Sequence, residues 1–465
     1  MIAVHTVEQV RAADAAQIAV LPDGELMQRA ARGLAEVLRA ELVGRSRSVL
    51  LLVGPGNNGG DALYAGAILA TSGVRVWVWR STDSYHVDGW QALAEAGGRE
   101  VDHAGALGLV GSVGIVVDGV YGIGARAGLP DPVAQLAAEC RAVGARVVAV
   151  DMPSGVEADS CEVSGDAFAA GRTVTFGAYK RCQVLEPARS RCGEVTLVDI
   201  GLELPPADLV AWEAADVAAA WPWPDASSDK YSRGVVGLDT GSETYPGAGV
   251  LSALGAVYAG SGMVRCLGPE AVFDAVSRVL PNVVRADGQV QAWLAGSGWG
   301  DRPGERLTEL LATGLPLVVD ADGLKHLPQR LNRPEVVLTP HAGELARILR
   351  VLRADVVADP VGCVRAAVER FGMTVLLKGA TQYVATPGDD RVHLAVPGPA
   401  WTAQAGSGDV LAGIVATLLA AGLSPVAAAV CGASVQAMTA AAHPGPYPPQ
   451  DLARHLPATI AALAR

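Results

Sequence analysis

The most regular feature of the chain is the alternation of short apolar runs with longer segments of helical spacing. Between the first two runs, residues 61–72 carry apolar side chains at helical intervals. Continuous apolar runs of this length are typical of buried parallel strands. The runs in the first part of the chain are Ser48–Val53, Val74–Trp79, Gly114–Asp118 and Arg146–Asp151. Strand, turn, helix and strand repeated in this way predict an α/β fold, with helices on both faces of a parallel sheet.

The pattern stops once, at Trp221–Asp229, where two prolines and small polar residues without periodicity indicate a linker. A second alternating series follows and closes with a long Ala-rich helix after Gly408. Its predicted strands are Gly234–Leu238, Leu315–Asp320, Glu335–Thr339 and Thr374–Lys378. We therefore predict two α/β domains, residues 1–222 and 226–465, which agrees with a length of 465 residues.

Composition and charge narrow the class of protein. Half of the residues are apolar and 18% are charged, which is enough for large buried cores. The formal net charge of −12 argues against a general binder of nucleic acid or of anionic membranes. We expect Gly, Pro or charge to interrupt the long apolar runs before they reach membrane-spanning length, so we expect no membrane partner.

Cysteines and the N-terminus indicate the compartment. Seven scattered cysteines form no CxxC pair, which favours reduced thiols and gives no support for zinc. The first residues lack a cationic segment followed by a long apolar core. We expect a cytoplasmic protein.

The stretch Gly54–Asp61, with the sequence GPGNNGGD, joins a predicted strand to a predicted helix. Glycine-rich turns at the carboxyl ends of strands let backbone N–H groups approach an anionic ligand. The stretch is neither G-x-G-x-x-G nor a P-loop, and a tight turn with a helix cap would explain it equally well. Two more glycine-rich turns at strand ends, Asp118–Gly124 and Asp151–Gly155, favour one shared ligand pocket.

The motifs NNGGDA, DGVYGIGARAGLP, VDMPSG and TFGAYK, in this order, resemble the N-terminal domain of the YjeF family, the NAD(P)H-hydrate epimerases. The resemblance covers roughly Thr6 to Pro205 and implies a Rossmann-like domain. It implies that Asp151 is the catalytic acid/base and that potassium is held by Asn58, Asp118 and Ser154. It further implies that the substrate is bound by Asn57, Asn58, Gly59, Gly60, Asp61, Gly122, Ile123, Gly124, Ala125, Arg126, Ala127, Gly128 and Asp151.

The chemistry is reasonable for these groups. Inversion at the hydroxyl-bearing ring carbon of a hydrated nicotinamide requires proton transfer, which a carboxylate on a rigid strand end can supply. Oxygen donors from Asn, Asp and Ser suit potassium better than a transition metal. Two positions depart from the family pattern: Ala62 replaces a glycine, and Arg126 stands where some members have lysine.

A second candidate site lies at Ala405–Asp409, AGSGD, directly before a long helix. The loop places backbone N–H groups at a helix N-terminus, where the dipole favours an anion. Asp409 is placed to act as a base toward a hydroxyl that attacks phosphorus, although it could also be only a helix cap.

AGSGD with TGSETYPGAG, VVDADGL, LTPHAGELARIL and LLKGATQYVATP resembles the ribokinase-like NAD(P)H-hydrate dehydratase domain, from roughly Lys230 onward. The resemblance implies phosphorylation of the ring hydroxyl by ADP with the help of magnesium, and then loss of phosphate. It implies that Asp409 is the base, and that the hydrated nucleotide is bound by Ala248, Gly298, His341 and Asp409. It implies that ADP is bound by Lys378, Gly379, Ala380, Thr381, Gln382 and Gly408.

One turn departs from this second pattern. The family's GPGLG turn is Gly296–Gly300, GSGWG, here. Ser297 therefore replaces a proline, and we expect Trp299 to add bulk near the nucleotide.

The leading hypothesis is a bifunctional repair enzyme that acts on NAD(P)HX with ADP, in which one domain supplies the epimer that the other consumes. The resemblance also implies a homo-oligomer, and the fused architecture resembles bacterial members that use ADP. Two alternatives stay open. One is a ribokinase-type small-alcohol or vitamin-precursor kinase with an accessory domain. In the other, the first domain is a binding module without catalysis.

Overall fold

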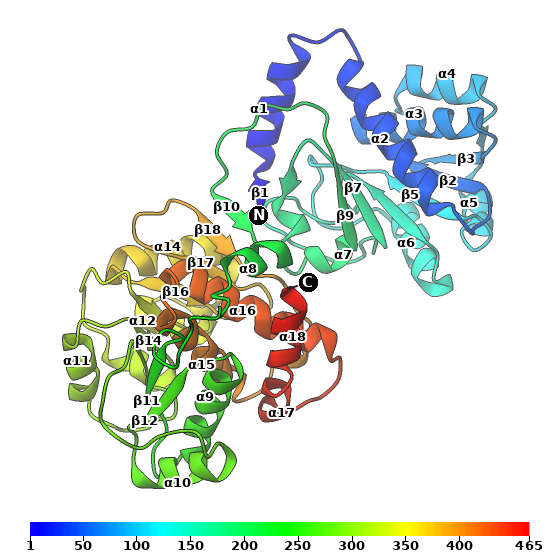
Figure 1. The fold of residues 1–465 in the computed structure, drawn as a ribbon. Helices are drawn as coiled ribbons and strands as arrows, with labels where there is room; N and C mark the ends of the chain where they lie inside the picture. The colour runs from blue at the N-terminus through cyan, green and yellow to red at the C-terminus, as the bar shows by residue number, and fades with distance from the viewer. Residues whose placement is uncertain (465) are drawn as a thin grey trace. The chain divides into compact units, whose positions relative to one another are not determined.

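The structure is a computed structural model that describes residues 1–464, and its chain divides into two compact units (Figure 1). The N-terminal unit comprises Ala3–Ala207, and the C-terminal unit comprises Met1–Ile2 with the chain from Asp208 onward. Each unit contains a mostly parallel sheet covered by helices, which confirms the predicted α/β class.

The N-terminal unit is built around a 7-stranded sheet of order β4-β3-β2-β5-β6-β7-β9, in which all neighbours are parallel. Its strands are β2 (Ser48–Val53), β3 (Arg75–Arg80), β4 (Arg99–Glu100), β5 (Ile115–Gly119), β6 (Val147–Val150), β7 (Arg172–Phe176) and β9 (Glu194–Val198), beside the short parallel pair of β1 (Ile2–His5) and β8 (Tyr179–Lys180). Its helices are α1 (Val7–Ile18), α2 (Glu25–Glu41), α3 (Asn57–Thr71), α4 (Val87–Glu95), α5 (His103–Leu109), α6 (Asp131–Val143) and α7 (Arg189–Cys192).

Strand β2 shows why the predicted strands are continuous apolar runs. Successive side chains of a strand point to opposite faces of the sheet. Val49 and Leu51 join the cluster that packs against α2 and α3, whereas Leu50 and Leu52 join the cluster with α5 and α6. Both faces are therefore buried, and an alternating polar pattern is absent from this strand.

The strand order reverses between β2 and β5, because β2 is followed along the chain by β3 on its other side. In open α/β sheets, ligands bind beyond the carboxyl ends of the strands at such a switch point. The turns after β2 and β5 are the Gly54–Asn57 turn and the Gly119–Gly124 segment. Both carry residues that the sequence predicts for the first site.

The C-terminal unit contains a sheet with the order β12-β11-β13-β14-β15-β16-β17-β18-β10. Pairs from β12 to β16 are parallel, and β17 pairs antiparallel with β16 and β18. Its switch point lies between β11 and β13. The strands are β10 (Leu209–Ala211), β11 (Val235–Asp239), β12 (Met263–Cys266), β13 (Ala292–Ala295), β14 (Leu317–Val319), β15 (Val336–Leu338), β16 (Thr374–Leu377), β17 (Tyr383–Ala385) and β18 (Val392–Leu394).

The largest apolar cluster of this unit joins α9, α15 and α16 to the sheet. The helices are α8 (Ala214–Ala220), α9 (Pro246–Tyr258), α10 (Glu270–Val279), α11 (Glu305–Ala312), α12 (Ala342–Leu349), α13 (Arg353–Ala358), α14 (Pro360–Phe371), α15 (Ser407–Ala420), α16 (Pro425–Ala442), α17 (Pro449–Ala453) and α18 (Leu456–Leu463). Contrary to the expectation that every apolar run is interrupted, α16 is long and apolar enough by length and composition to cross a membrane. However, 67% of it is buried inside the structure, as in a core helix.

The division between the units lies earlier than the pattern break near residue 225 suggests. Strand β10 pairs with β18, and Val217 of α8 and Trp221 are buried in the main apolar cluster of the C-terminal unit. Residues 208–222 therefore pack with the C-terminal unit. Their short strand and helix were not recognised in the sequence, because only the proline-rich segment after them breaks the pattern.

Candidate functional sites

A cleft of about 930 Å³ lies in the N-terminal unit. Several elements contribute to it: α1, the beginning of α2, the β2–α3 turn, the segment after β5, and single residues after β6 and in β7 and β8. Of the predicted substrate-binding residues, the lining includes Asn57, Asn58, Asp61, Gly122, Ile123, Gly124, Ala125 and Asp151. Gly59, Gly60, Arg126, Ala127 and Gly128 are not among the residues that line it.

The β2–α3 turn is held tightly against the end of β5. A Cβ atom on Gly54 would lie 1.8 Å from the carbonyl oxygen of Val120, so only glycine fits there. Helix α3 begins at Asn57, and the NNGGD segment is its first turn rather than a loop. The predicted helix start at Asp61 is therefore too late. The Cβ of Ala62 faces Gly119 of β5, so this departure from the family pattern points toward the sheet.

Asp151 follows β6 with a backbone φ of 64°, in the left-handed region. Its backbone is fixed by hydrogen bonds, since its N–H donates to Val174 O at 2.7 Å and its carbonyl accepts from Gln183 Nε2 at 2.7 Å. Its Oδ1 accepts hydrogen bonds from Lys180 Nζ at 2.5 Å and from Thr175 Oγ1 at 3.1 Å. The carboxylate is thus anchored through one oxygen at the edge of the cleft.

Two more carboxyl groups share the cleft with the Asp151–Lys180 ion pair. Burial raises the pKa of Asp61 well above its ordinary value, and the charges of Asp151 and Asp14 raise it further. Burial also raises the pKa of Asp14 on α1; Asp151 adds to this effect and Lys180 opposes it. Asp61 and Asp14 therefore hold a proton more readily than exposed carboxyl groups do, which suits acid/base chemistry in this cleft.

Of the predicted potassium residues, Asn58 lines the cleft, whereas Asp118 and Ser154 are buried and are not among its lining residues. Ser154 donates to both oxygens of the buried Asp118, through its Oγ to Oδ1 at 2.6 Å and through its backbone N–H to Oδ2 at 2.7 Å. Burial raises the pKa of Asp118 to about 6, against the effect of these hydrogen bonds. Asn58 lies against Gly122, and its side-chain Nδ2 is buried with no hydrogen-bond partner among the described residues.

In the C-terminal unit, Asp320 at the end of β14 is the centre of a buried polar cluster. Its Oδ1 accepts from Lys378 Nζ at 2.6 Å and from Thr339 Oγ1 at 2.8 Å, and its Oδ2 accepts from Ser297 Oγ at 2.8 Å. Burial alone would raise the pKa of Asp320, but Lys378 and these hydrogen bonds hold it below its ordinary value. The same ion pair raises the pKa of Lys378 although its burial acts in the opposite direction.

Asp409 lies in the first turn of α15, whose N-cap is Gly406. Burial raises the pKa of Asp409 to about 7, and the nearby Asp320 raises it further, whereas Lys378 and a hydrogen bond with Ser297 lower it. A Cβ on Gly408 would lie 3.1 Å from Lys378 Nζ. The predicted base and the predicted nucleotide-binding residues are therefore brought together at this helix N-terminus.

His341 and the segment Lys378–Gln382 lie on neighbouring strand ends. The N–H of Lys378 donates to Pro340 O at 2.8 Å, and Lys378–Gln382 forms the connection to the antiparallel strand β17. His341 is the N-cap of α12: its Nδ1 accepts from the backbone N–H groups of Gly343 and Glu344. Its Nε2 edge is left for other contacts, with Glu344 Oε1 3.6 Å away.

The Gly296–Gly300 turn lies at the switch point beside α9. A Cβ on Gly298 would meet the Cβ of Ala248 at 2.5 Å, so these two predicted substrate residues are adjacent. Trp299 is only 1% exposed and donates from Nε1 to Asp239 O at 2.7 Å. Its indole therefore supports the turn from within the core, contrary to the expectation that it adds bulk beside the nucleotide.

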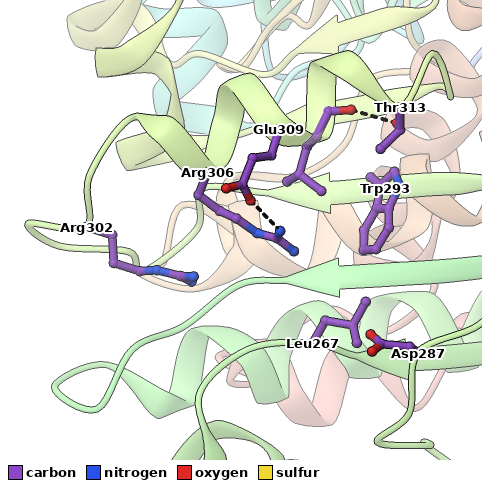
Figure 2. Close-up of a pocket in the computed structure, with 8 residues that line it drawn as sticks. Leu267, Asp287, Trp293, Arg302, Arg306, Glu309 and Thr313 are labelled. Atoms are coloured by element: carbon purple, nitrogen blue, oxygen red, sulfur yellow. Dashed lines mark hydrogen bonds and ion pairs between the residues drawn. The ribbon is translucent and has the colours of Figure 1, made fainter.

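A second cavity of about 560 Å³ lies near the Gly296–Gly300 turn, between α11 and the sheet (Figure 2). Arg302 and Arg306 extend in the same direction along it. Both guanidinium groups pair with the buried Asp239, Arg302 at 2.6 Å, and Arg302 also lies over the Trp299 ring. Both cations are paired with the protein's own carboxylate. We therefore interpret the two arginines as stabilising this part of the fold rather than as binding an anionic ligand.

Three residues in these sites had no role assigned from the sequence. Lys180 belongs to TFGAYK and Asp320 to VVDADGL, so the motifs could have indicated both. Asp14 lies on an Ala-rich helix without a motif, and only folding brings it to the cleft.

Comparison with known proteins agrees with this two-site architecture. Residues 236–461 match the family described as NAD(P)H-hydrate dehydratase, and residues 23–182 match the family described as YjeF-related protein N-terminus. The chain is 43% identical to the bifunctional NAD(P)H-hydrate repair enzyme Nnr of Mycobacterium leprae over 95% of both chains. It is 35% identical to the enzyme of the same name from Corynebacterium glutamicum, over 90% of this chain and 87% of that one.

Solved structures agree on the fold of the C-terminal unit. An ADP/ATP-dependent NAD(P)H-hydrate dehydratase from Bacillus subtilis, co-crystallised with ATP and Mg²⁺, aligns with a TM-score of 0.50 at 24% identity, over 55% of this chain and 99% of that one. A ribokinase-like superfamily protein from Enterococcus faecalis aligns with a TM-score of 0.51 at 20% identity, over 56% of this chain and 99% of that one. The chain therefore belongs to the family of bifunctional NAD(P)H-hydrate repair enzymes.

Proposed function

We propose that the chain repairs hydrated nicotinamide nucleotides in two steps. The N-terminal unit interconverts the R and S epimers of NAD(P)HX, and the C-terminal unit dehydrates the S epimer with ADP, giving NAD(P)H, AMP and phosphate. The observation that carries this proposal is the 43% identity to a bifunctional repair enzyme over 95% of the chain. This identity spans both units, which favours the repair enzyme over a small-alcohol kinase with an accessory domain.

In the first step, Asp151 acts as the acid and then as the base. The ring nitrogen of the substrate expels the neighbouring hydroxyl, which leaves as water with the proton of Asp151. Water then adds to the other face of the ring carbon and returns a proton to the carboxylate. Lys180 and Thr175 already occupy Oδ1 of Asp151, so we assign the proton transfer to Oδ2.

Potassium fits beside this cleft. Asn58, Asp118 and Ser154 offer oxygen ligands with a single charge, as suits potassium. The atom of Asn58 that is buried without a partner among the described residues is Nδ2, and exchanging the amide oxygen and nitrogen would place there an oxygen that can bind a cation. Potassium would supply a fixed positive charge near the bound phosphates. The matching of the three residues to the family motif supports this assignment.

In the second step, Asp409 removes the proton from the substrate hydroxyl as its oxygen attacks the β-phosphorus of ADP. The P–O bond to AMP breaks, and the ring nitrogen then expels the phosphorylated hydroxyl as phosphate, which is a better leaving group than hydroxide. The neighbouring ring carbon finally loses a proton, which forms the ring double bond of NAD(P)H. A base with a pKa of about 7 is well matched to this task at neutral pH. Lys378 and the N-terminus of α15 provide positive potential for the transferred group.

Magnesium would accompany the nucleotide. Within residues 1–464, no group of three or more His, Cys, Asp or Glu side chains forms a ready metal site, so magnesium would be bound chiefly through the ADP phosphates. The Bacillus subtilis relative crystallised with ATP and Mg²⁺ supports this cofactor. We further propose a cytoplasmic homo-oligomer, as the family resemblance implies. The net charge of −12 supports the absence of nucleic-acid and anionic-membrane partners.

The proposal is tested with separated R- and S-NADHX in potassium buffer, by following NADH formation with and without ADP. Both epimers should give NADH when ADP is present, and ADP-free protein should only equilibrate them. The Asp151→Asn variant should repair the S epimer normally and the R epimer only at the spontaneous rate. A wild-type protein that forms no NADH from either epimer would contradict the proposal, whereas R-epimer persistence alone would indicate a non-catalytic N-terminal unit.

A smaller R-epimer rate in sodium than in potassium buffer, at equal ionic strength, would support the potassium assignment. The S-epimer rate serves as the control in the same samples. Equal R-epimer rates in both buffers would contradict it.

A further inference from the structure

We propose that Arg11 of α1 binds a phosphate group of the dinucleotide substrate in the cleft of the N-terminal unit. The inference rests on the proposed epimerisation and adds a residue that the catalytic assignment does not include. Arg11 is exposed and lines the cleft. It precedes residues 23–182, the part of this unit that matches a family, so that match gives it no role.

The cleft is rich in carboxyl groups. Two cationic side chains line it, Arg11 and Lys180, against five aspartates: Asp14, Asp23, Asp61, Asp88 and Asp151. Lys180 is buried, and its ammonium is paired with Asp151. A nicotinamide dinucleotide carries negative charge on each of its phosphates. A cleft of this composition therefore needs a further, unpaired cation that faces the substrate.

Arg11 is that cation. Within residues 1–464, its guanidinium forms no ion pair and no hydrogen bond, and Asp14 on the same face of α1 is not paired with it. The charge of Arg11 also acts on Asp159, but both oxygens of that carboxylate accept from the N–H of Val7. A guanidinium presents its N–H donors in a planar fork that fits phosphate oxygens. In Arg11 these donors are available to a ligand.

The guanidinium of Arg11 lies against the glycine-rich turn after β5. A Cβ on Gly124 would lie 3.0 Å from Arg11 Nη2. The turn is closed by the N–H of Ala125, which donates to Gly122 O at 2.9 Å. At its other end, a Cβ on Gly122 would lie 3.3 Å from the side chain of Asn58. The turn therefore lies between Arg11 and the first turn of α3.

The N-terminus of α3 offers a second support for an anion. The helix has 15 residues, and its N-cap, Gly56, provides no side-chain hydrogen bond to the first N–H groups. These N–H groups and the helix dipole favour a phosphate. A dinucleotide bound along the turn after β5 meets the end of α3 on one side and Arg11 on the other.

The experiment measures KM and kcat for epimerisation of R-NADHX and of R-NADPHX without ADP, by chromatographic separation of the epimers. Arg11→Gln should raise KM about tenfold, the effect of a lost hydrogen bond between charged groups. Its kcat should stay within about threefold of wild type, because the phosphates are bound alike in the ground state and in the transition state. Arg11→Lys keeps the charge without the planar fork, so its KM should lie between those of wild type and Arg11→Gln.

Arg45→Gln is the matched control. Arg45 is also an exposed arginine of the N-terminal unit, and it is not among the residues that line the cleft. Its substitution removes the same charge from the unit, and the wild-type KM should be retained.

The two substrates show which phosphate Arg11 binds. Equal increases in KM assign Arg11 to the pyrophosphate, which both substrates carry. An increase for R-NADPHX alone assigns it to the additional ribose phosphate, and either result supports the proposal. Unchanged KM values for both substrates, a fall in kcat alone, or an equal increase in Arg45→Gln would overturn it.

Thermal unfolding of each variant identifies misfolding. If Arg11→Gln is unfolded, Arg11→Lys decides: a raised KM supports the proposal, and a wild-type KM overturns it. A wild-type protein that does not interconvert the epimers would refute the proposed epimerisation and the inference with it. An active wild type together with an unaffected Arg11→Gln variant would overturn only the role of Arg11.

Discussion

Asp409 combines two properties that a helix cap would not need together: a position at the N-terminus of α15 and a pKa raised to about 7 by burial and by Asp320. Replacement by asparagine keeps its size but removes the proton acceptor. We expect Asp409→Asn to lower the ADP-dependent dehydration rate by about 10²–10⁴-fold, the usual contribution of a general base. The rate of epimerisation, measured on the R epimer without ADP, should not change.

The control for this prediction is Asp451→Asn. Asp451 is also an acidic residue in the first turn of a helix, α17, but it pairs with Arg454 at the surface. If Asp409 served only as a helix-capping charge, the two variants would lose similar, small amounts of activity. That outcome would remove Asp409 from the mechanism.

Asp14 shares its cleft with Asp151 and Lys180, and burial raises the pKa of its carboxyl group, so Asp14 can carry a proton beside the substrate. We expect Asp14→Asn to lower the epimerisation rate about tenfold, less than the loss of the acid/base itself. Glu8→Gln, an exposed position on the same helix, is the matched control. Equal rates for Asp14→Asn and wild type across pH 5–9 would show that Asp14 only lines the cleft.

Residues differ in how far the sequence reveals them. Asp151 and Asp409 are predictable because each stands at the junction of a strand or helix with a glycine-rich turn. Asp14 is not, since α1 is Ala-rich and places this carboxyl in the cleft only through the packing of the whole unit. The Asp320–Lys378 pair joins residues from two different strand ends, and a single sequence does not show which strand ends are neighbours.

At the scale of elements, the crossing of the β2–α3 turn over the end of β5 depends on one glycine. A Cβ on Gly54 would lie 1.8 Å from Val120 O, and backbone atoms cannot move aside as a flexible side chain can. We expect Gly54→Ala to destabilise the N-terminal unit by about 3 kcal/mol, at the upper end for overpacking. Epimerisation should fall as well, because Asn57 and Asn58 follow directly. Urea unfolding and the R-epimer assay measure these two effects.

Gly56→Ala is the control for this prediction. Gly56 lies two residues later in the same turn, has a φ of −99°, and a Cβ there would meet nothing within 4 Å. The free energy of unfolding of the Gly56→Ala variant should stay within about 0.5 kcal/mol of wild type, as for substitutions at tolerant surface positions. Equal destabilisation by both substitutions would mean that the turn itself, rather than its contact with β5, limits stability.

The predicted elements follow the burial pattern closely where both faces of a strand are apolar, as in β2. The start of α3 was missed because Asn57–Gly60 has poor helix propensity. Tertiary contact overrides that propensity: a Cβ on Gly59 would lie 2.3 Å from Gly54 O, so the helix needs glycine to pack against the turn. Local propensity therefore misjudges a helix start where close backbone approach is required.

At the scale of the whole molecule, the position of the unit boundary predicts how the chain can be divided. A fragment that begins at Asp208 keeps β10 on β18 and keeps Val217 and Trp221 in the apolar cluster. A fragment that begins at Ala226 loses all of them. We expect the longer fragment to dehydrate S-NADHX with near-native kcat. The shorter one should unfold at a Tm at least about 5 °C lower, the shift expected for roughly 2 kcal/mol.

The N-terminal fragments supply the comparison. Residues 1–207 and 1–225 both contain the complete 7-stranded sheet, so both should epimerise R-NADHX at similar rates. Equal Tm values for the two C-terminal fragments would show that residues 208–225 add nothing to the C-terminal unit. Loss of folding in both N-terminal fragments would show that this unit does not fold by itself.

Every hydrogen bond and ion pair described for the two sites joins residues of the same unit. Free-energy effects of substitutions add when the substituted positions share no partners. A double variant, Asp151→Asn with Asp409→Asn, should therefore show the sum of the two single effects and no coupling energy. Because the two sites act independently, the activity of the unchanged site measures how much active protein each sample contains. The ratio of the two activities in one tube cancels errors in protein amount and in active fraction, so that small changes at either site can be measured.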